Sequence, residues 1–237
     1  MHWRVGLIDS CGVMPGSVAS AGFVLEDAAA SAAGRDRAVV RVPSRVDPTG
    51  HGTRIATLLM QDHCDIELVL AQVFVGPGAT NAAVVGSAID WCRAEGANLL
   101  HLSLGLANDR APLAGAVERA ISSGCVMVAA TPARGAAVFP AAYPGVIQGT
   151  GDARCAAGEI SCLRPRTFGG CPRMGECASD DFSPRALAGA SLSGQGASIG
   201  AAHVTRAILQ GAVSSPGEVV AALTAKARYW GPELRYI

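Results

Sequence analysis

Two repeating patterns of apolar residues divide the chain into predicted strands and helices. Short, almost continuous apolar runs are typical of buried strands, and they occur at residues 3–9, 38–43, 66–75, 97–105, 125–131 and 145–151. Apolar residues recur at helical spacing over residues 27–34, 53–61, 81–96, 111–124, 197–212 and 216–230. Asn81 and Gly96 bound one of these segments as its predicted N-cap and C-terminal stop.

The order of these segments indicates the fold class. Strands that alternate with helices are typical of a parallel sheet covered on both faces. We therefore expect one three-layer α/β domain over residues 1–237, with a mostly parallel sheet between the helices. Residues 152–185 are the exception, because they are rich in Cys, Arg, Pro and Gly and show little periodicity. We expect a long loop or insertion there.

Composition and charge narrow the range of functions. Hydrophobic residues make up 50% of the 237 residues and charged residues only 16%, which excludes a disordered chain. The net charge is zero, the arginines are scattered, and no stretch forms a basic face with interleaved aromatic residues, so we expect no nucleic-acid partner. No apolar run is long enough to span a membrane. A predicted strand begins almost at Met1, with no signal-peptide or pro-segment pattern, which favours a cytoplasmic location.

Three polar residues stand where a parallel α/β sheet holds its ligands. Asp9 ends the first predicted strand, His51 lies between two glycines at a helix start, and Ser198 begins another helix in a glycine-rich stretch. Such sheets bind ligands at the carboxyl ends of their strands. A serine needs a base to take its proton, and the base needs a carboxylate to fix its tautomer. Each residue alone could be a turn or cap residue, but together they form a candidate triad.

The motifs around these residues carry a family resemblance. "VGLIDSCG" (5–12), "GHGTRIA" (50–56) and "GASIGAAHV" (196–204) resemble, in this order, the Asp, His and Ser boxes of the subtilisin-like serine proteases. Between them, "LLHLSLG" (99–105) resembles the strand of that family along which substrate binds, and "YPGVIQGTG" (143–151) resembles a later strand. Five matches in the family's order cover most of the chain.

The resemblance implies a subtilisin-like fold and a serine endopeptidase that works through an acyl-enzyme. In that role Asp9 orients His51, His51 is the general base, and Ser198 is the nucleophile. The glycines beside His51 would let the serine reach the imidazole.

The resemblance also implies how substrate binds. The family adds a peptide to the sheet as an extra strand, which places a peptide or precursor protein along Ser103, Leu104 and Gly105, with Ala129 and Ala130 nearby. We expect a dedicated protease that removes a leader from one precursor, with a maturation complex as a further partner. Among the family's processing enzymes, the chain resembles the one that acts on the small subunit of quinohemoprotein amine dehydrogenase.

One departure from the family pattern bears on activity. Where the family has a Gly-Asn whose side chain completes the oxyanion hole, this chain has Thr131-Pro132, and proline offers neither a side-chain donor nor an N–H. Loss of such a donor costs about 3–4 kcal/mol of transition-state stabilisation. The Ser198 N–H remains, and Thr131 or Arg134 could supply a second donor. The departure predicts a slow, specialised protease or, alternatively, a peptide-binding pseudoprotease.

Cysteines and further histidines have several interpretations. Four cysteines share the predicted loop: Cys155, Cys162, Cys171 and Cys177. Metal binding, disulfides and free thiols all fit their spacing, which is wider than that of common zinc sites. Cys11 is expected to be a small buried residue near the site, and His101 and His203 are expected to be structural. No calcium-ligand cluster is recognisable, and we expect no metal or other cofactor.

Overall fold

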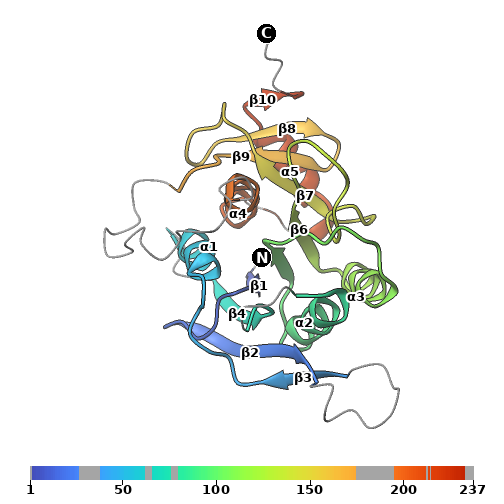
Figure 1. Cartoon of the computed structure of the whole chain (residues 1–237). Helices are drawn as coiled ribbons and strands as arrows, with labels where there is room; N and C mark the ends of the chain where they lie inside the picture. Colours follow the sequence, from blue (N-terminus) through green and yellow to red (C-terminus); the bar gives the residue numbers. More distant parts are fainter. Residues whose placement is uncertain are drawn as a thin grey trace.

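The frame of the molecule is one ten-stranded sheet (Figure 1). The computed structural model describes residues 2–26, 38–61, 66–75, 80–174, 195–211, 213 and 215–232. Its strands are β1 (Arg4–Asp9), β2 (Ser17–Leu25), β3 (Val39–Val42), β4 (Glu67–Gln72), β5 (Leu99–Leu102), β6 (Val126–Ala130), β7 (Ile147–Gly151), β8 (Ile160–Arg164), β9 (Thr167–Gly170) and β10 (Tyr229–Trp230). They follow the order β10-β8-β9-β7-β6-β5-β1-β4-β2-β3. Every neighbouring pair is parallel except β2–β3 and β8–β9, which confirms the predicted, mostly parallel sheet.

Helices cover both faces of this sheet. They are α1 (His51–Met60), α2 (Ala82–Ala94), α3 (Ala111–Ser122), α4 (Gln195–Leu209) and α5 (Val219–Lys226), with a 3₁₀ turn at Pro216–Glu218 before α5. Two hydrophobic cores result, one between the sheet and α2 with α3, the other between the sheet and α1, α4 and α5 (Figure 1). The expected three-layer α/β architecture is confirmed.

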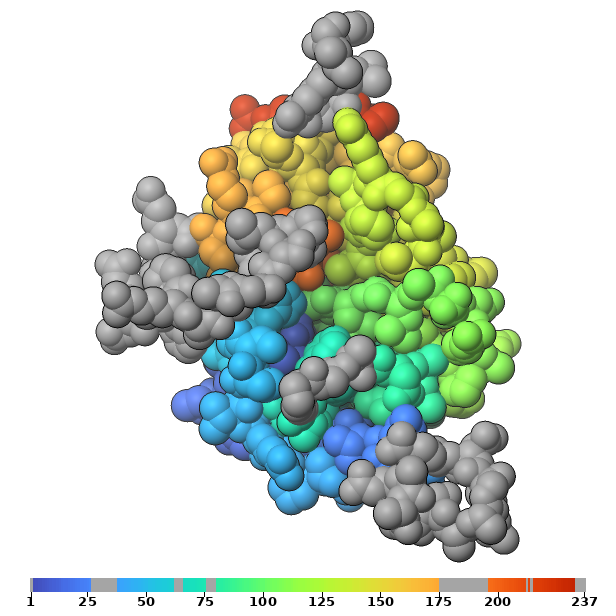
Figure 2. All heavy atoms as spheres, viewed as in Figure 1, coloured from blue at the N-terminus to red at the C-terminus, as the bar shows by residue number. Residues whose placement is uncertain are grey.

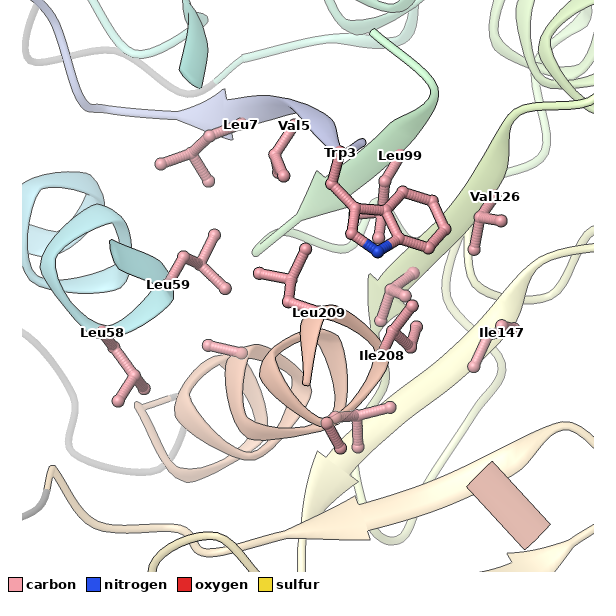
Figure 3. Close-up of a cluster of buried hydrophobic side chains, with 14 of the residues drawn as sticks. Trp3, Val5, Leu7, Leu58, Leu59, Leu99, Val126, Ile147, Ile208 and Leu209 are labelled. Atoms are coloured by element: carbon pink, nitrogen blue, oxygen red, sulfur yellow. The ribbon is translucent and has the colours of Figure 1, made fainter. Parts of the chain in front are cut away.

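The core beneath α1 and α4 shows how strand alternation builds the layers. Figure 3 shows Leu59 of α1 and Leu209 of α4 in the same cluster as Leu7 of β1 and Leu99 of β5. The next residue along β5, Leu100, belongs to the opposite core, because successive side chains of a strand point to opposite faces. Odd-numbered β5 residues therefore face α4.

Local sequence explains where the helices begin and end. The Asn81 side chain accepts hydrogen bonds from the N–H groups of Ala83 and Val84 at 3.0 and 3.1 Å, as the predicted N-cap of α2 should. Gly96 follows the helix with φ of 85°, a conformation that glycine adopts without strain. Both predictions for this helix are confirmed.

The structure differs from the sequence-based expectation in three places. Within the predicted loop 152–185, residues 160–170 form the β8–β9 hairpin, because β9 continues the sheet beside β7. The helix predicted to run to residue 230 ends at Lys226, and Tyr229–Trp230 pair with β8 instead. Strand β2 has no counterpart among the predicted strands. The predicted helix over 27–34 lies outside the described residues.

The described helices include none that combines the length and the apolarity required to cross a bilayer.

Candidate active site

The topology brings Asp9 and His51 into direct contact. Asp9 ends β1, which lies between β4 and β5 in the sheet, and His51 is the first residue of α1. The His51 Nδ1 atom lies 2.9 and 3.0 Å from the two carboxylate oxygens of Asp9. The Asp9 side chain is 3% exposed, and the backbone N–H of Ser10 donates to it at 2.6 Å. The carboxylate is therefore buried but well bonded, as an orienting acid needs to be.

A second carboxylate fixes the start of α1. Asp47 accepts hydrogen bonds from the N–H groups of Thr49, Gly50 and Thr53 at 2.8–3.0 Å, and from the Thr53 hydroxyl at 2.8 Å. These are the backbone groups that a helix leaves without partners at its N-terminus. Sequence analysis missed this role, although an Asp a few residues before a predicted helix is a recognised capping signal.

Close packing explains one of the two glycines beside His51. A Cβ atom at Gly52 would lie 2.3 Å from the backbone nitrogen of Cys11, so only glycine lets α1 approach the chain just after β1. Gly50 has φ of 68°, which favours glycine as well. These two observations give the glycines a local role in the contact between α1 and β1, and their role in the approach of Ser198 stays a prediction.

Neighbouring charges make His51 easier to protonate than an ordinary histidine. Burial alone lowers the pKa of His51, but the Asp9 charge, the hydrogen bond to Asp9 and the Asp47 charge raise it above its ordinary value of 6.5. The imidazole is 29% exposed. A histidine with a partly exposed ring and a carboxylate on one nitrogen is suited to proton transfer through the other.

Ser198 lies in the first turn of α4 and is 6% exposed. Its hydroxyl donates to the backbone carbonyl of Ser103 at 3.1 Å. Within the described ranges, no hydrogen bond joins that hydroxyl to His51. The structure thus brings Asp9 and His51 together, and it directs the Ser198 hydroxyl to Ser103, the residue that follows β5. Figure 2 shows the blue α1 segment, the green segment after β5 and the orange start of α4 on one face.

A cavity of about 740 Å³ adjoins Ser198. Its lining includes most of the residues predicted to bind substrate or oxyanion, namely Ser103, Leu104, Gly105, Ala130, Thr131 and Arg134. Ala129, the remaining predicted residue, is fully buried and is not part of the lining. Segments that are far apart in the sequence thus line one cavity at the carboxyl ends of the strands, whereas Asp9 and His51 are not part of its lining.

Neither Thr131 nor Pro132, where the oxyanion donor was expected, offers a free backbone N–H to this cavity. The N–H of Thr131 donates to the carbonyl of Gly149 at 2.8 Å, so it is committed to the pairing of β6 with β7. Pro132 also lines the cavity and has no N–H. The Thr131 hydroxyl and the exposed Arg134 side chain remain as neighbouring groups that can donate.

The two other histidines make interior contacts. His101 is fully buried and hydrogen-bonded through both ring nitrogens. The Nε2 atom of His203 lies 3.3 Å from the Arg173 carbonyl. Neither histidine has a contact with Asp9 or Ser198 among the hydrogen bonds of the described residues.

The cysteines of the described ranges are free thiols. Cys11, Cys155, Cys162 and Cys171 are all buried, and burial raises the pKa of Cys11 to about 12 and that of Cys155 to about 11. No group of three or more potential metal-ligating side chains occurs in the parts of the chain that the structure describes. Of the interpretations left open for the loop cysteines, packing thiols fit these three; Cys177 lies outside the described residues.

Comparison with known proteins gives one sequence relative. No family model matches the chain. The chain is 32% identical over 147 residues to the subtilisin-like protease het-Q2 of Podospora anserina, a match that covers 58% of this chain. The matched part of this chain spans only 38% of that relative's length.

Solved protease structures also align with the chain. The S41 psychrophilic protease aligns with a TM-score of 0.55 over 94% of this chain and 82% of its own, at 13% identity. The prenylagaramide maturation protease PagA aligns with a TM-score of 0.44 over 67% of this chain and 56% of its own, at 16% identity. The chain is thus similar in sequence to a subtilisin-like protease, and the alignment with the S41 psychrophilic protease supports a shared α/β fold.

Proposed function

We propose that the chain is a serine endopeptidase that uses Asp9, His51 and Ser198. The observation that carries this proposal is the contact of His51 Nδ1 with both carboxylate oxygens of Asp9, at 2.9 and 3.0 Å. This contact lies at the carboxyl ends of the strands, where Ser198 borders the cavity. An aspartate in this position keeps the proton on Nδ1 and leaves Nε2 free to accept one.

The chemistry follows from these positions. The Ser198 hydroxyl leaves the Ser103 carbonyl and gives its proton to Nε2 of His51 while its oxygen bonds to the carbonyl carbon of the substrate. The tetrahedral intermediate then collapses, the peptide C–N bond breaks, and His51 returns the proton to the leaving amine. Water repeats the sequence on the acyl-enzyme and releases Ser198. Asp9 stabilises the imidazolium at each stage without taking its proton.

The substrate we propose is an extended peptide segment of a precursor protein. It would lie along Ser103, Leu104 and Gly105, with one side chain in the cavity beside Ala130. Pro132 favours a dedicated processing protease over a general one, because a slow enzyme suffices when binding selects one precursor. The identity of that precursor, including the quinohemoprotein subunit, stays a prediction.

Labelling with a fluorophosphonate tests the proposal, because the probe needs an activated serine but no knowledge of the substrate. Intact mass should show one adduct on the wild-type chain and none on Ser198→Ala. An unmodified wild-type chain with a normal unfolding transition would contradict the proposal.

A second function has one observation in its favour. Pro132 occupies the cavity wall where the family's oxyanion donor is expected, and the nearby Thr131 N–H is already engaged. A peptide-binding pseudoprotease on this fold would keep the cavity and dispense with catalysis. It predicts no adduct in the same experiment but saturable binding of the precursor peptide.

The labelling rate should also depend on pH. It should rise with pH through a midpoint above 6.5, because only neutral His51 accepts the serine proton and the pKa of His51 is raised by Asp9 and Asp47. Rate constants measured from pH 5 to 9 check this. In Asp47→Asn one of the raising charges is lost, so the midpoint should move to lower pH; a midpoint that does not move would show that Asp47 has no electrostatic effect on the base.

A further inference from the structure

A polar chain crosses the apolar core behind the cavity. His101 lies on the face of β5 that packs against α4, and its partners in register on the neighbouring strands are Leu7 of β1 and Val128 of β6. All three residues are fully buried. The cluster on this face is otherwise built from apolar side chains such as Leu99. A histidine is therefore an unusual choice at this position, because a buried polar ring has to find its own partners.

His101 finds a partner for each ring nitrogen. Nδ1 lies 2.8 Å from the Thr205 hydroxyl and Nε2 lies 2.8 Å from the Ser103 hydroxyl. Burial lowers the pKa of His101 to about 4, so the ring is neutral near pH 7. A neutral imidazole has one donor and one acceptor nitrogen, so one hydroxyl must accept and the other must donate. The three side chains form one fully satisfied and ordered link.

Both ends of this link lead to Ser198. Ser103 lines the cavity, and its carbonyl accepts the Ser198 hydroxyl at 3.1 Å. Thr205 follows Ser198 by seven residues on α4, which is about two helical turns, so both residues lie on the same side of the helix. His101 thus connects the segment that would receive substrate with the helix that carries the serine.

We propose that His101 is a positioning residue for Ser198, whose hydrogen bonds to Ser103 and Thr205 fix the substrate-binding segment after β5 relative to α4. The inference rests on the proposed peptidase function. A displacement of about 1 Å between a nucleophile and its substrate can cost about 10²-fold in rate. The link restrains such a displacement, because it joins the segment after β5 to α4 next to Ser198.

Stability alone does not account for the link. When all partners of a buried polar group are replaced by apolar groups of similar shape, the change in stability is close to neutral. A merely structural role therefore predicts that an apolar version of the link leaves both folding and reactivity intact. The proposed role predicts that the apolar version folds normally but that Ser198 loses reactivity.

The test is the double variant His101→Leu/Thr205→Val in the full chain. Ser103 keeps its hydroxyl in this variant, but it lines the cavity and can bond to water there. We therefore expect the thermal unfolding midpoint to stay close to that of the wild type, while the rate of fluorophosphonate labelling of Ser198 falls about 10²-fold. His101→Gln keeps one amide donor and one acceptor, so it should recover part of this loss. As a control, Ser161→Ala removes another buried hydroxyl, which donates to Asp152 at 2.6 Å, and should lower stability without changing the labelling rate.

The outcomes separate this inference from the proposed function. A folded double variant that is labelled within twofold of the wild-type rate overturns the inference and leaves the peptidase in place. A wild-type chain that takes no adduct overturns the function, and the inference with it. If the double variant does not fold, Thr205→Val alone decides by the same rate comparison, together with the ¹⁵N resonances of the His101 ring. Those resonances should shift when Ser198 is labelled, and unchanged resonances count against the link.

Discussion

The Asp9→Asn variant should react with a fluorophosphonate about 10⁴-fold more slowly than the wild-type chain. Both carboxylate oxygens of Asp9 face Nδ1 of His51, so this nitrogen carries the proton and Nε2 can accept another. An asparagine can present its amide hydrogens to Nδ1, which favours the wrong tautomer, and it lacks the charge that stabilises the imidazolium. Second-order rate constants from intact mass spectrometry provide the measurement.

A matched control separates this effect from the loss of any buried carboxylate. Asp152 is also buried, at 5% exposure, and is bonded to Arg154 and Ser161. Asp152→Asn should lower stability yet keep the labelling rate within a few-fold of wild type. Equal rate losses in the two variants would mean that Asp9 acts through the fold and not through His51.

The Pro132→Asn variant should hydrolyse an activated ester about 10²-fold faster than the wild-type chain. The cavity wall at this position supplies no donor from Pro132, and the Thr131 N–H is bonded to Gly149. An asparagine adds a backbone N–H and a side-chain amide where negative charge develops on the substrate oxygen. Burst and steady-state rates with a p-nitrophenyl ester measure the acylation and deacylation steps separately.

Pro132→Ala is the control for this gain, because it restores the N–H without the amide side chain. Its rate should stay close to that of the wild type if the side chain is the effective donor. A Pro132→Asn chain no faster than Pro132→Ala would instead show that the oxyanion hole is already complete, with Thr131 or Arg134 as the second donor.

Sequence patterns predicted the fold where local and tertiary preferences agree. The apolar runs of β1, β4, β5 and β6 are buried on both faces, so their composition alone indicates strands. The sequence "SVASAGFVL" of β2 mixes small, polar and apolar residues, and its first half is only partly buried. That strand forms because β4 and β3 offer it partners on both sides, which no local pattern records. The β8–β9 hairpin was missed for the same reason.

The candidate site divides in a similar way. Asp9 and His51 were predicted from motifs, and the structure brings them within hydrogen-bonding distance. The contacts of His101 could not be predicted, because they join β5 to a residue 104 positions away on α4. The direction of the Ser198 hydroxyl depends equally on a partner 95 positions away. Local motifs can identify candidate residues, but the three-dimensional fold determines which of them come into contact.

The central place of β1 has a consequence for how the candidate site is lost on heating. Amide hydrogens of a strand flanked on both sides exchange mainly through global opening, whereas the edges of a sheet fray locally. β1 lies between β4 and β5, while β3 and β10 form the two edges of the sheet. The Asp9 end of the site therefore belongs to the most protected cooperative unit. Warming should fray the margins of the sheet first, and the contact between Asp9 and His51 should survive until the whole domain melts.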